Sequence, residues 1–175
     1  MGNKALLIID IQEDYTGINS DKKTRYSGAD ELVMRVNKII EESKRNGMDI
    51  IYIKQEFAGV IPVLLTKLFS HGTAIKGKPG TEFDKRLNII SNNCFSKSVP
   101  SAFSNDELKK YLKENKIEEL DVVGLDGQFC VKETIKAAIK ENYHVNLISN
   151  AVLFKNENKR QDVFENLKKL GVQII

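Results

Sequence analysis

A continuous apolar run near the amino terminus, residues 4–10, constrains the fold more than any other feature of the sequence. Five apolar residues there precede an aspartate, a pattern typical of a parallel strand that is buried on both faces. An amphipathic helical pattern begins at residue 29 and stops at Asn46 and Gly47, and a second apolar run covers residues 48–53. The order strand, helix, strand predicts a right-handed parallel crossover and therefore an α/β fold.

The rest of the chain repeats this alternation of short apolar runs and helical patterns. Ser104 and Glu107 predict the capping box of one helix, and Gly171 predicts the end of the last helix. Further strands are predicted at residues 93–97, 120–123, 143–148 and 172–175, and further helices within residues 60–69 and from about residues 104, 130 and 159. We therefore predict one domain over residues 1–175, a three-layer α/β/α fold around a six-stranded, mainly parallel sheet.

The composition is that of an ordinary globular domain. The 175 residues are 41% hydrophobic and 29% charged, enough for a full core without disulfides or a metal. The net charge of +3 is too small to predict a nucleic-acid partner. No apolar run reaches the about 18 residues of a membrane span. We expect a cytoplasmic protein with two free cysteines, no nucleic-acid partner and no membrane association.

Three reactive side chains lie at or just after the carboxyl ends of predicted strands. Asp10 follows the first strand, Lys97 ends a later one, and Cys130 lies in the first turn of the helix that follows another. Ligands bind at this edge of open α/β sheets, so the three groups share one cleft if their strands are neighbours. The helix start favours the thiolate form of Cys130. Cys94 lacks such a setting and is expected to pack as a small buried hydrophobe.

These residue types are the parts that an acyl-transfer nucleophile needs. A carboxylate can take the thiol proton, a lysine ammonium can stabilise the thiolate, and amides at a helix start can hold an oxyanion. The polar, irregular segments at residues 13–28 and 57–87 are expected to supply the walls of the pocket.

Four segments, spread in order over nearly the whole chain, form a set of motifs. They are residues 5–12 (Ala-Leu-Leu-Ile-Ile-Asp-Ile-Gln), 78–83 (Lys-Pro-Gly-Thr-Glu-Phe), 97–103 (Lys-Ser-Val-Pro-Ser-Ala-Phe) and 124–131 (Gly-Leu-Asp-Gly-Gln-Phe-Cys-Val), with Thr134 behind the last. Together they resemble the isochorismatase-like cysteine hydrolases, which include nicotinamidases and related amidohydrolases. The resemblance implies the strand order 3-2-1-4-5-6 and a catalytic triad of Asp10, Lys97 and Cys130. It also implies a cis peptide bond between Leu125 and Asp126.

The resemblance further implies how the triad works. The backbone amides of Asp126 and Cys130 form the oxyanion hole, and Asp10 accepts the Cys130 proton. The thiolate attacks the substrate, Asp10 returns the proton to the leaving amine, and water releases the acid from the thioester. No cofactor is expected. Relatives self-associate, so a homodimer or larger homo-oligomer is expected.

The chain departs from the metal-containing nicotinamidases after the second strand, where Gln55 and Glu56 stand in place of an Asp/His ligand set. His71 and His144 are the only histidines, so a multi-histidine site is excluded and no metal is expected. The candidate substrate contacts are Gln12, Gln55, Glu56, Phe103 and Phe129. For Gln55 and Glu56 the alternative is a solvated loop. Asp126, where relatives have small or hydroxyl residues, is expected to point away from the thiol or to cap the helix.

Three functions compete at this point. The leading prediction is a metal-independent cysteine amidohydrolase acting on a small amide or carbamoyl compound. The alternative enzyme is a vinyl-ether hydrolase of the isochorismatase type, and Cys130 argues against it because those relatives do not need the cysteine. The third is a catalytically idle binding or assembly module, and retention of all three triad residues argues against it.

Overall fold

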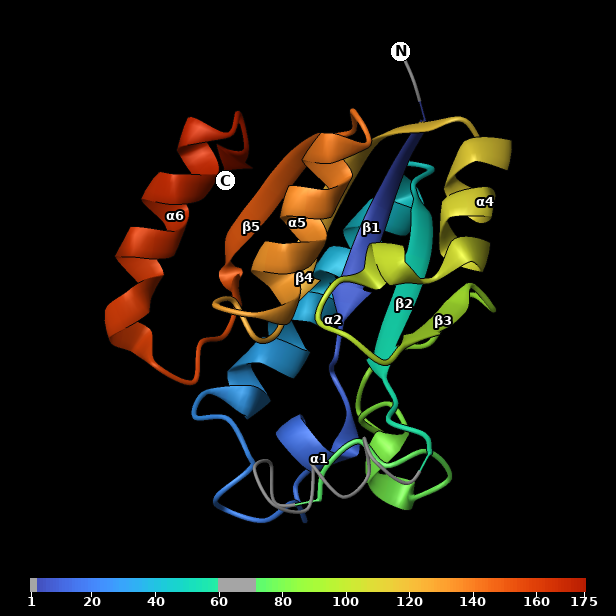
Figure 1. Ribbon diagram of the computed structural model, residues 1–175. Helices are drawn as coiled ribbons and strands as arrows, with labels where there is room; N and C mark the ends of the chain where they lie inside the picture. Colours follow the sequence, from blue (N-terminus) through green and yellow to red (C-terminus); the bar gives the residue numbers. More distant parts are fainter. Residues whose placement is uncertain (1–2, 60–71) are drawn as a thin grey trace.

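A six-stranded parallel sheet forms the centre of the computed structural model, which describes residues 3–59 and 72–175 (Figure 1). Its strand order is β3-β2-β1-β4-β5-β6, and every neighbouring pair is parallel. The predicted fold and strand order are therefore confirmed. The strands are β1 (Asn3–Ile9), β2 (Asp49–Gln55), β3 (Cys94–Lys97), β4 (Ile117–Gly124), β5 (His144–Val152) and β6 (Gln173–Ile174).

The α-helices within the described ranges cover both faces of the sheet, except for the short α1 (Glu13–Thr16), which lies beyond the carboxyl ends of the strands (Figure 1). The others in these ranges are α2 (Ala29–Arg45), α4 (Asp106–Glu114), α5 (Cys130–Lys140) and α6 (Arg160–Lys169), with short 3₁₀ turns η1 (Pro79–Thr81), η2 (Ala102–Ser104) and η3 (Glu157–Lys159). Figure 1 shows α2 behind the sheet and α4, α5 and α6 in front of it. None of the helices in this described part of the chain has the length and apolar composition needed to cross a membrane.

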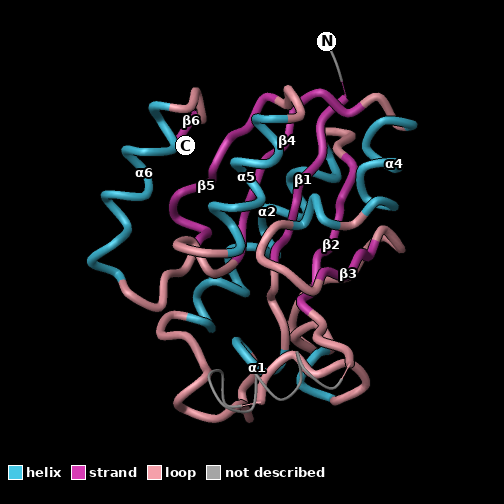
Figure 2. Tube along the Cα trace, in the orientation of Figure 1, coloured by secondary structure: helices cyan, strands magenta, loops and turns pink. Residues whose placement is uncertain are grey.

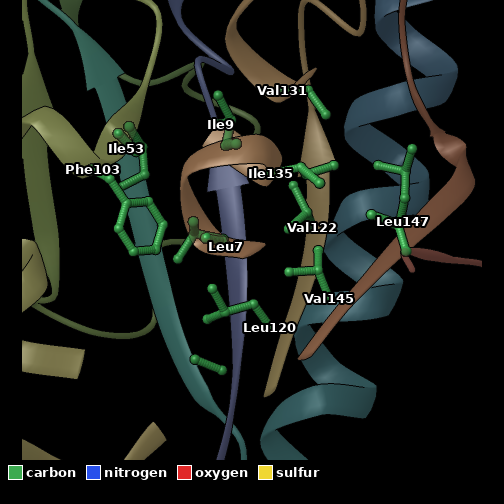
Figure 3. Packing of buried hydrophobic residues seen from close by; sticks show 14 of the residues in the cluster. Leu7, Ile9, Ile53, Phe103, Leu120, Val122, Val131, Ile135, Val145 and Leu147 are labelled. Atoms are coloured by element: carbon green, nitrogen blue, oxygen red, sulfur yellow. The ribbon is translucent and has the colours of Figure 1, made fainter. Parts of the chain in front are cut away.

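The β1 strand is buried on both faces, as its apolar run predicts. Leu7 and Ile9 belong to a core shared with α4, α5 and α6, whereas Leu6 and Ile8 belong to a second core shared with α2. Figure 3 shows Leu7 and Ile9 beside Ile135 of α5. Burying a large aliphatic side chain contributes roughly 1.5–3 kcal/mol, so successive residues of this one strand hold the two helical layers onto the sheet.

Some local predictions differ from the structure. The N-cap of α4 is Asn105 rather than Ser104, because the Asn105 side-chain oxygen accepts the Leu108 N–H at 2.9 Å. The β5 strand continues to Val152, past the end predicted from the sequence. The predicted short helix at residues 60–69 lies outside the described residues.

The long polar connections gather at the carboxyl edge of the sheet. Figure 2 shows the loops after β1 and β2 extending beyond the ends of these strands, where they surround α1. The amino ends of the strands lie at the opposite edge, where His144 begins β5. The fold therefore places its irregular segments around one edge, which is where a parallel sheet presents its ligand site.

Candidate active site

The carboxyl ends of neighbouring strands position the three predicted triad residues. Asp10 follows β1, Lys97 is the last residue of β3, and Cys130 is the first residue of α5, after β4. Because β2 lies between β1 and β3, its last residue, Gln55, pairs in register with Lys97. Asp10 itself has a φ of 55°, in the left-handed region that Asp tolerates better than most residues.

The Lys97 ammonium lies at the centre of the cluster. Its Nζ is 2.8 Å from Asp10 Oδ2, 2.5 Å from Gln55 Oε1 and 3.3 Å from Cys130 Sγ. The Lys97 side chain is 0% exposed, and the Asp10 side chain is 2% exposed. The structure thus brings an acid, a cation and a sulfur nucleophile from distant parts of the chain into contact in a region from which water is largely excluded.

Burial controls the protonation of the cluster. The pKa of the Cys130 thiol is raised to about 12, chiefly by burial and also by the Asp10 carboxylate, and Lys97 partly opposes this change. Burial also raises the pKa of Asp10, and the Lys97 ammonium opposes that change. Burial lowers the pKa of Lys97, but the charges of Asp10 and Cys130 outweigh it and raise the pKa overall.

The direction of the Cys130 shift favours a neutral thiol. This direction is opposite to the one that the helix start predicts, because burial of the sulfur and the neighbouring Asp10 carboxylate both disfavour the thiolate. The Lys97 ammonium favours the carboxylate form of Asp10, and an ionised Asp10 can accept the Cys130 proton.

Cys94 lies outside this cluster, and its predicted burial is also wrong. It is exposed because it begins β3, the strand at the edge of the sheet. An edge strand has a neighbour on one side only, so its side chains have fewer groups to pack against.

A cavity of about 590 Å³ adjoins the cluster. Asp10, Gln55 and Cys130 contribute to its lining, and aromatic side chains form much of the remainder: Tyr15, Tyr26, Phe57 and Phe129. This volume lies within the roughly 300–1,000 Å³ typical of small-molecule sites. A small compound with an apolar body therefore fits beside the thiol.

One lysine ties the first long loop to the rim of the cavity. The Lys155 Nζ contacts the backbone carbonyls of Lys23, Thr24 and Arg25 at 2.9, 3.3 and 3.4 Å. It also lies 5.0 Å from the centre of the Tyr26 ring. Neither Lys155 nor the tyrosines of the cavity were identified as site residues from sequence, because nothing in their spacing distinguishes them from solvated loop residues.

The turn between β4 and α5 leaves two amides available for an anion. The Leu125–Asp126 peptide bond is cis, at the position that the resemblance implies. Within the described residues, the N–H groups of Asp126 and Cys130 have no hydrogen-bond acceptor, whereas the next amide, that of Val131, donates to the Asp126 carbonyl at 3.0 Å. Unpaired amides at a helix start suit a developing oxyanion.

The Asp126 side chain does not cap α5, the second of its two expected roles, because its oxygens bind other backbone amides. It is 4% exposed and contributes to the lining of the cavity. Its two oxygens accept the backbone N–H groups of Gln128 and Lys155, each at 2.6 Å. The carboxylate thus connects the turn between β4 and α5 to the segment that follows β5.

The candidate substrate contacts divide into two groups. Gln55 and Phe129 line the cavity. Gln12, Glu56 and Phe103 do not line it, so assigning them as contacts was wrong for this structure.

Each of these three side chains is engaged elsewhere. Gln12 is 0% exposed and hydrogen-bonds to the backbone of Gln55 and to the Thr81 carbonyl. Glu56 pairs with Lys54 at 3.2 Å. Phe103 is buried in the core shared with α5. A polar or aromatic residue within a site motif can thus serve to hold the loop rather than to bind substrate.

The last residue of β2 and the residue that follows it do not fit a metal site. The Gln55 oxygen is bound to Lys97, and the Glu56 carboxylate is paired with Lys54. Across residues 3–59 and 72–175, no three His, Cys, Asp or Glu side chains are grouped so that they could hold a metal ion. The acids and the amide at this edge are instead arranged around lysines.

Comparison with known proteins agrees with the fold and the sequence motifs. The profile of the Isochorismatase domain matches residues 4–175. A protein of Arabidopsis thaliana described as a probable inactive nicotinamidase is 24% identical over 180 residues, covering 98% of this chain and 91% of its own.

Solved structures resemble the chain over almost its entire length. An isochorismatase-like hydrolase from Alkaliphilus metalliredigens has 25% identity and a TM-score of 0.83, covering 99% of this chain and 93% of its own. A nicotinamidase from Bacillus subtilis has 24% identity and a TM-score of 0.85, covering 98% of each chain. Because the domain profile spans nearly the whole sequence and these structures share its fold, the chain belongs to the isochorismatase family.

Proposed function

We propose that this protein is a metal-independent cysteine hydrolase that cleaves a C–N bond of a small amide or carbamoyl compound through a Cys130 thioester. The observation that carries the proposal is the contact of the Lys97 ammonium with both Asp10 and Cys130, at 2.8 and 3.3 Å, beside a cavity. A solvated lysine at a strand end would not be 0% exposed. Buried charges of this kind persist where they are paired and used.

The proposed reaction begins with proton transfer. Asp10 takes the Cys130 proton as the sulfur forms a bond to the substrate carbonyl carbon, and Lys97 stabilises the negative charge as it moves from carboxylate to sulfur. The substrate oxygen becomes an anion held by the amides of Asp126 and Cys130. Asp10 then gives the proton to the substrate nitrogen, the C–N bond breaks, and an amine or ammonia leaves. Water hydrolyses the remaining thioester, which restores the thiol and releases the acid.

The donor set supports a reaction without a metal. The Glu56 and Asp10 carboxylates are paired with Lys54 and Lys97, and the proton transfers that a metal-bound water would perform fall to Asp10. No cofactor enters the proposed reaction. Self-association into a dimer or larger homo-oligomer, expected from the family, stays a prediction that sedimentation velocity can test.

Ammonia release tests the proposal. The protein is incubated with a panel of small amides, ureas and carbamoyl compounds, and intact-mass spectrometry follows acyl adducts. We expect at least one compound to release ammonia with a transient adduct, Cys130→Ala to abolish both, and Cys94→Ala to leave both unchanged. Cys94 provides the matched control because it is the other free cysteine, yet exposed and outside the cavity.

Two outcomes would favour other functions. Turnover of a vinyl ether that persists in Cys130→Ala would favour the isochorismatase-type reaction. A folded protein that binds compounds in the cavity but neither turns over nor forms an adduct would favour an idle relative.

A further inference from the structure

Two buried polar atoms beside the nucleophile make no hydrogen bond within the described residues. They are Gln55 Nε2 and Asp10 Oδ1. Their residues are 4% and 2% exposed, and both line the cavity with Cys130. Because buried polar groups in native proteins are almost always paired, an unmatched donor and an unmatched acceptor at one reactive site indicate a ligand.

The orientation of the Gln55 amide follows from its neighbour. Lys97 Nζ is 2.5 Å from Gln55 Oε1, and an ammonium has donors only, so the amide oxygen must face it. Turning the amide over would place two donors against each other. The Nε2 group is therefore held as a donor, and its amide shares the Lys97 ammonium with the Asp10 carboxylate, which binds that ammonium at 2.8 Å.

The chemistry of the two atoms selects the group that joins them. The missing partner must accept a hydrogen bond from Gln55 and donate one to Asp10. In the proposed reaction the substrate carbonyl oxygen is already held by the amides of Asp126 and Cys130, and an amide nitrogen is a poor acceptor, so neither substrate atom can take the hydrogen bond from Gln55. Water does both through a single oxygen, and it must reach Asp10 once the amine has left.

We propose that Gln55 is a catalytic residue that holds the hydrolytic water against Asp10 for the breakdown of the thioester. This inference rests on the proposed cysteine-hydrolase function and names the group that completes its second half. The Gln55 Nε2–H donates to the water oxygen, and the water donates one hydrogen to Asp10 Oδ1. Its remaining lone pair is then free to attack the thioester carbon.

The step balances without an added reactant. The water oxygen forms a bond to the thioester carbon as one of its protons passes to Asp10. The tetrahedral anion collapses, the C–S bond breaks, and the Cys130 sulfur leaves with the electron pair and recovers the proton from Asp10. The product is a carboxylic acid, and Gln55 is unchanged because it only donates a hydrogen bond.

An acylating probe separates the two halves of the reaction. p-Nitrophenyl acetate is added to the Cys94→Ala protein, so that Cys130 is the one thiol to acetylate. Nitrophenolate release measures acylation, and intact mass measures loss of the acetyl group. In Gln55→Met, which removes the Nε2 donor, we expect acylation to change less than threefold and deacylation to slow by roughly 10²-fold, as a misplaced reactant does.

Two further variants keep the test decisive. Gln55→Glu retains an oxygen for Lys97 but has no Nε2 donor, so it should also slow deacylation. It serves as the test variant if Gln55→Met does not fold. Lys54→Gln is the matched control because Lys54 is the adjacent residue, pairs with Glu56 and does not line the cavity. It should deacylate at the unchanged rate.

The outcomes distinguish this inference from the proposed function. Equal slowing of acylation and deacylation in the Gln55 variants would assign Gln55 to substrate binding and overturn the inference, as would unchanged deacylation. A protein that carries both Cys94→Ala and Cys130→Ala has no thiol. If it formed the acetyl adduct as fast as the Cys94→Ala protein does, the cysteine mechanism itself would be refuted.

Discussion

The buried pair of Asp10 and Lys97 makes a quantitative prediction about stability. At 2.8 Å and an effective dielectric constant of 20, the attraction between the two charges is about 6 kcal/mol before the cost of desolvation. Removing one partner leaves the other charge buried and uncompensated. We therefore expect Lys97→Met and Asp10→Asn each to lower the free energy of unfolding by about 3–5 kcal/mol.

The double variant distinguishes the pair from two independent contacts. Once both charges are gone, no ion remains buried alone, so the double variant should lose less stability than either single variant. This corresponds to a coupling free energy of about 3 kcal/mol or more. Hydrolase activity should be absent from all three variants, because the double variant restores stability but supplies neither base nor cation.

Urea unfolding at neutral pH, followed by circular dichroism, measures the cycle. The control cycle uses Lys110 and Glu114, an exposed pair at 3.8 Å with side chains 72% and 64% exposed. Its coupling should stay below about 0.5 kcal/mol. If the losses at Asp10 and Lys97 simply add, the two charges do not compensate each other, and the electrostatic basis of the site is wrong.

Two more predictions concern the pH profile and the backbone of the site. The active form needs Asp10 ionised and Cys130 protonated, and both pKa values are raised, that of Cys130 to about 12. The value of kcat/KM should therefore fall as the pH drops through a carboxyl pKa above 3.8 and should stay level up to about pH 10. A decline that starts near pH 8.5, the usual thiol range, would contradict this. At Gly124, φ is 117° and an added Cβ would lie 2.1 Å from the Ile9 carbonyl oxygen, so Gly124→Ala should lower the free energy of unfolding by about 3 kcal/mol or more. The control is Gly171→Ala, at φ 89° with open space around it, which should cost only the backbone strain. Equal costs in thermal unfolding would show that the close approach of β1 and β4 is unimportant.

The sequence by itself determined the sheet and which side chains stand at the ends of its strands. The apolar run at residues 4–10 predicted a strand buried on both faces, and alternate residues of β1 do pack against opposite helical layers. The same pattern placed Asp10, Lys97 and Cys130 at strand ends. These inferences succeeded because strand burial and helix amphipathicity are periodic along the chain and need no knowledge of which distant segments meet.

Only the tertiary structure decided what each group does at the carboxyl edge. It set the protonation of Cys130, because the number of atoms that exclude water from a sulfur depends on segments far away in sequence. It placed Asp126 against two backbone amides, and it placed the Gln55 oxygen on Lys97. Periodicity ends where the strands end, so the loops and their side chains are positioned by contacts between distant residues, and these contacts have no local signature.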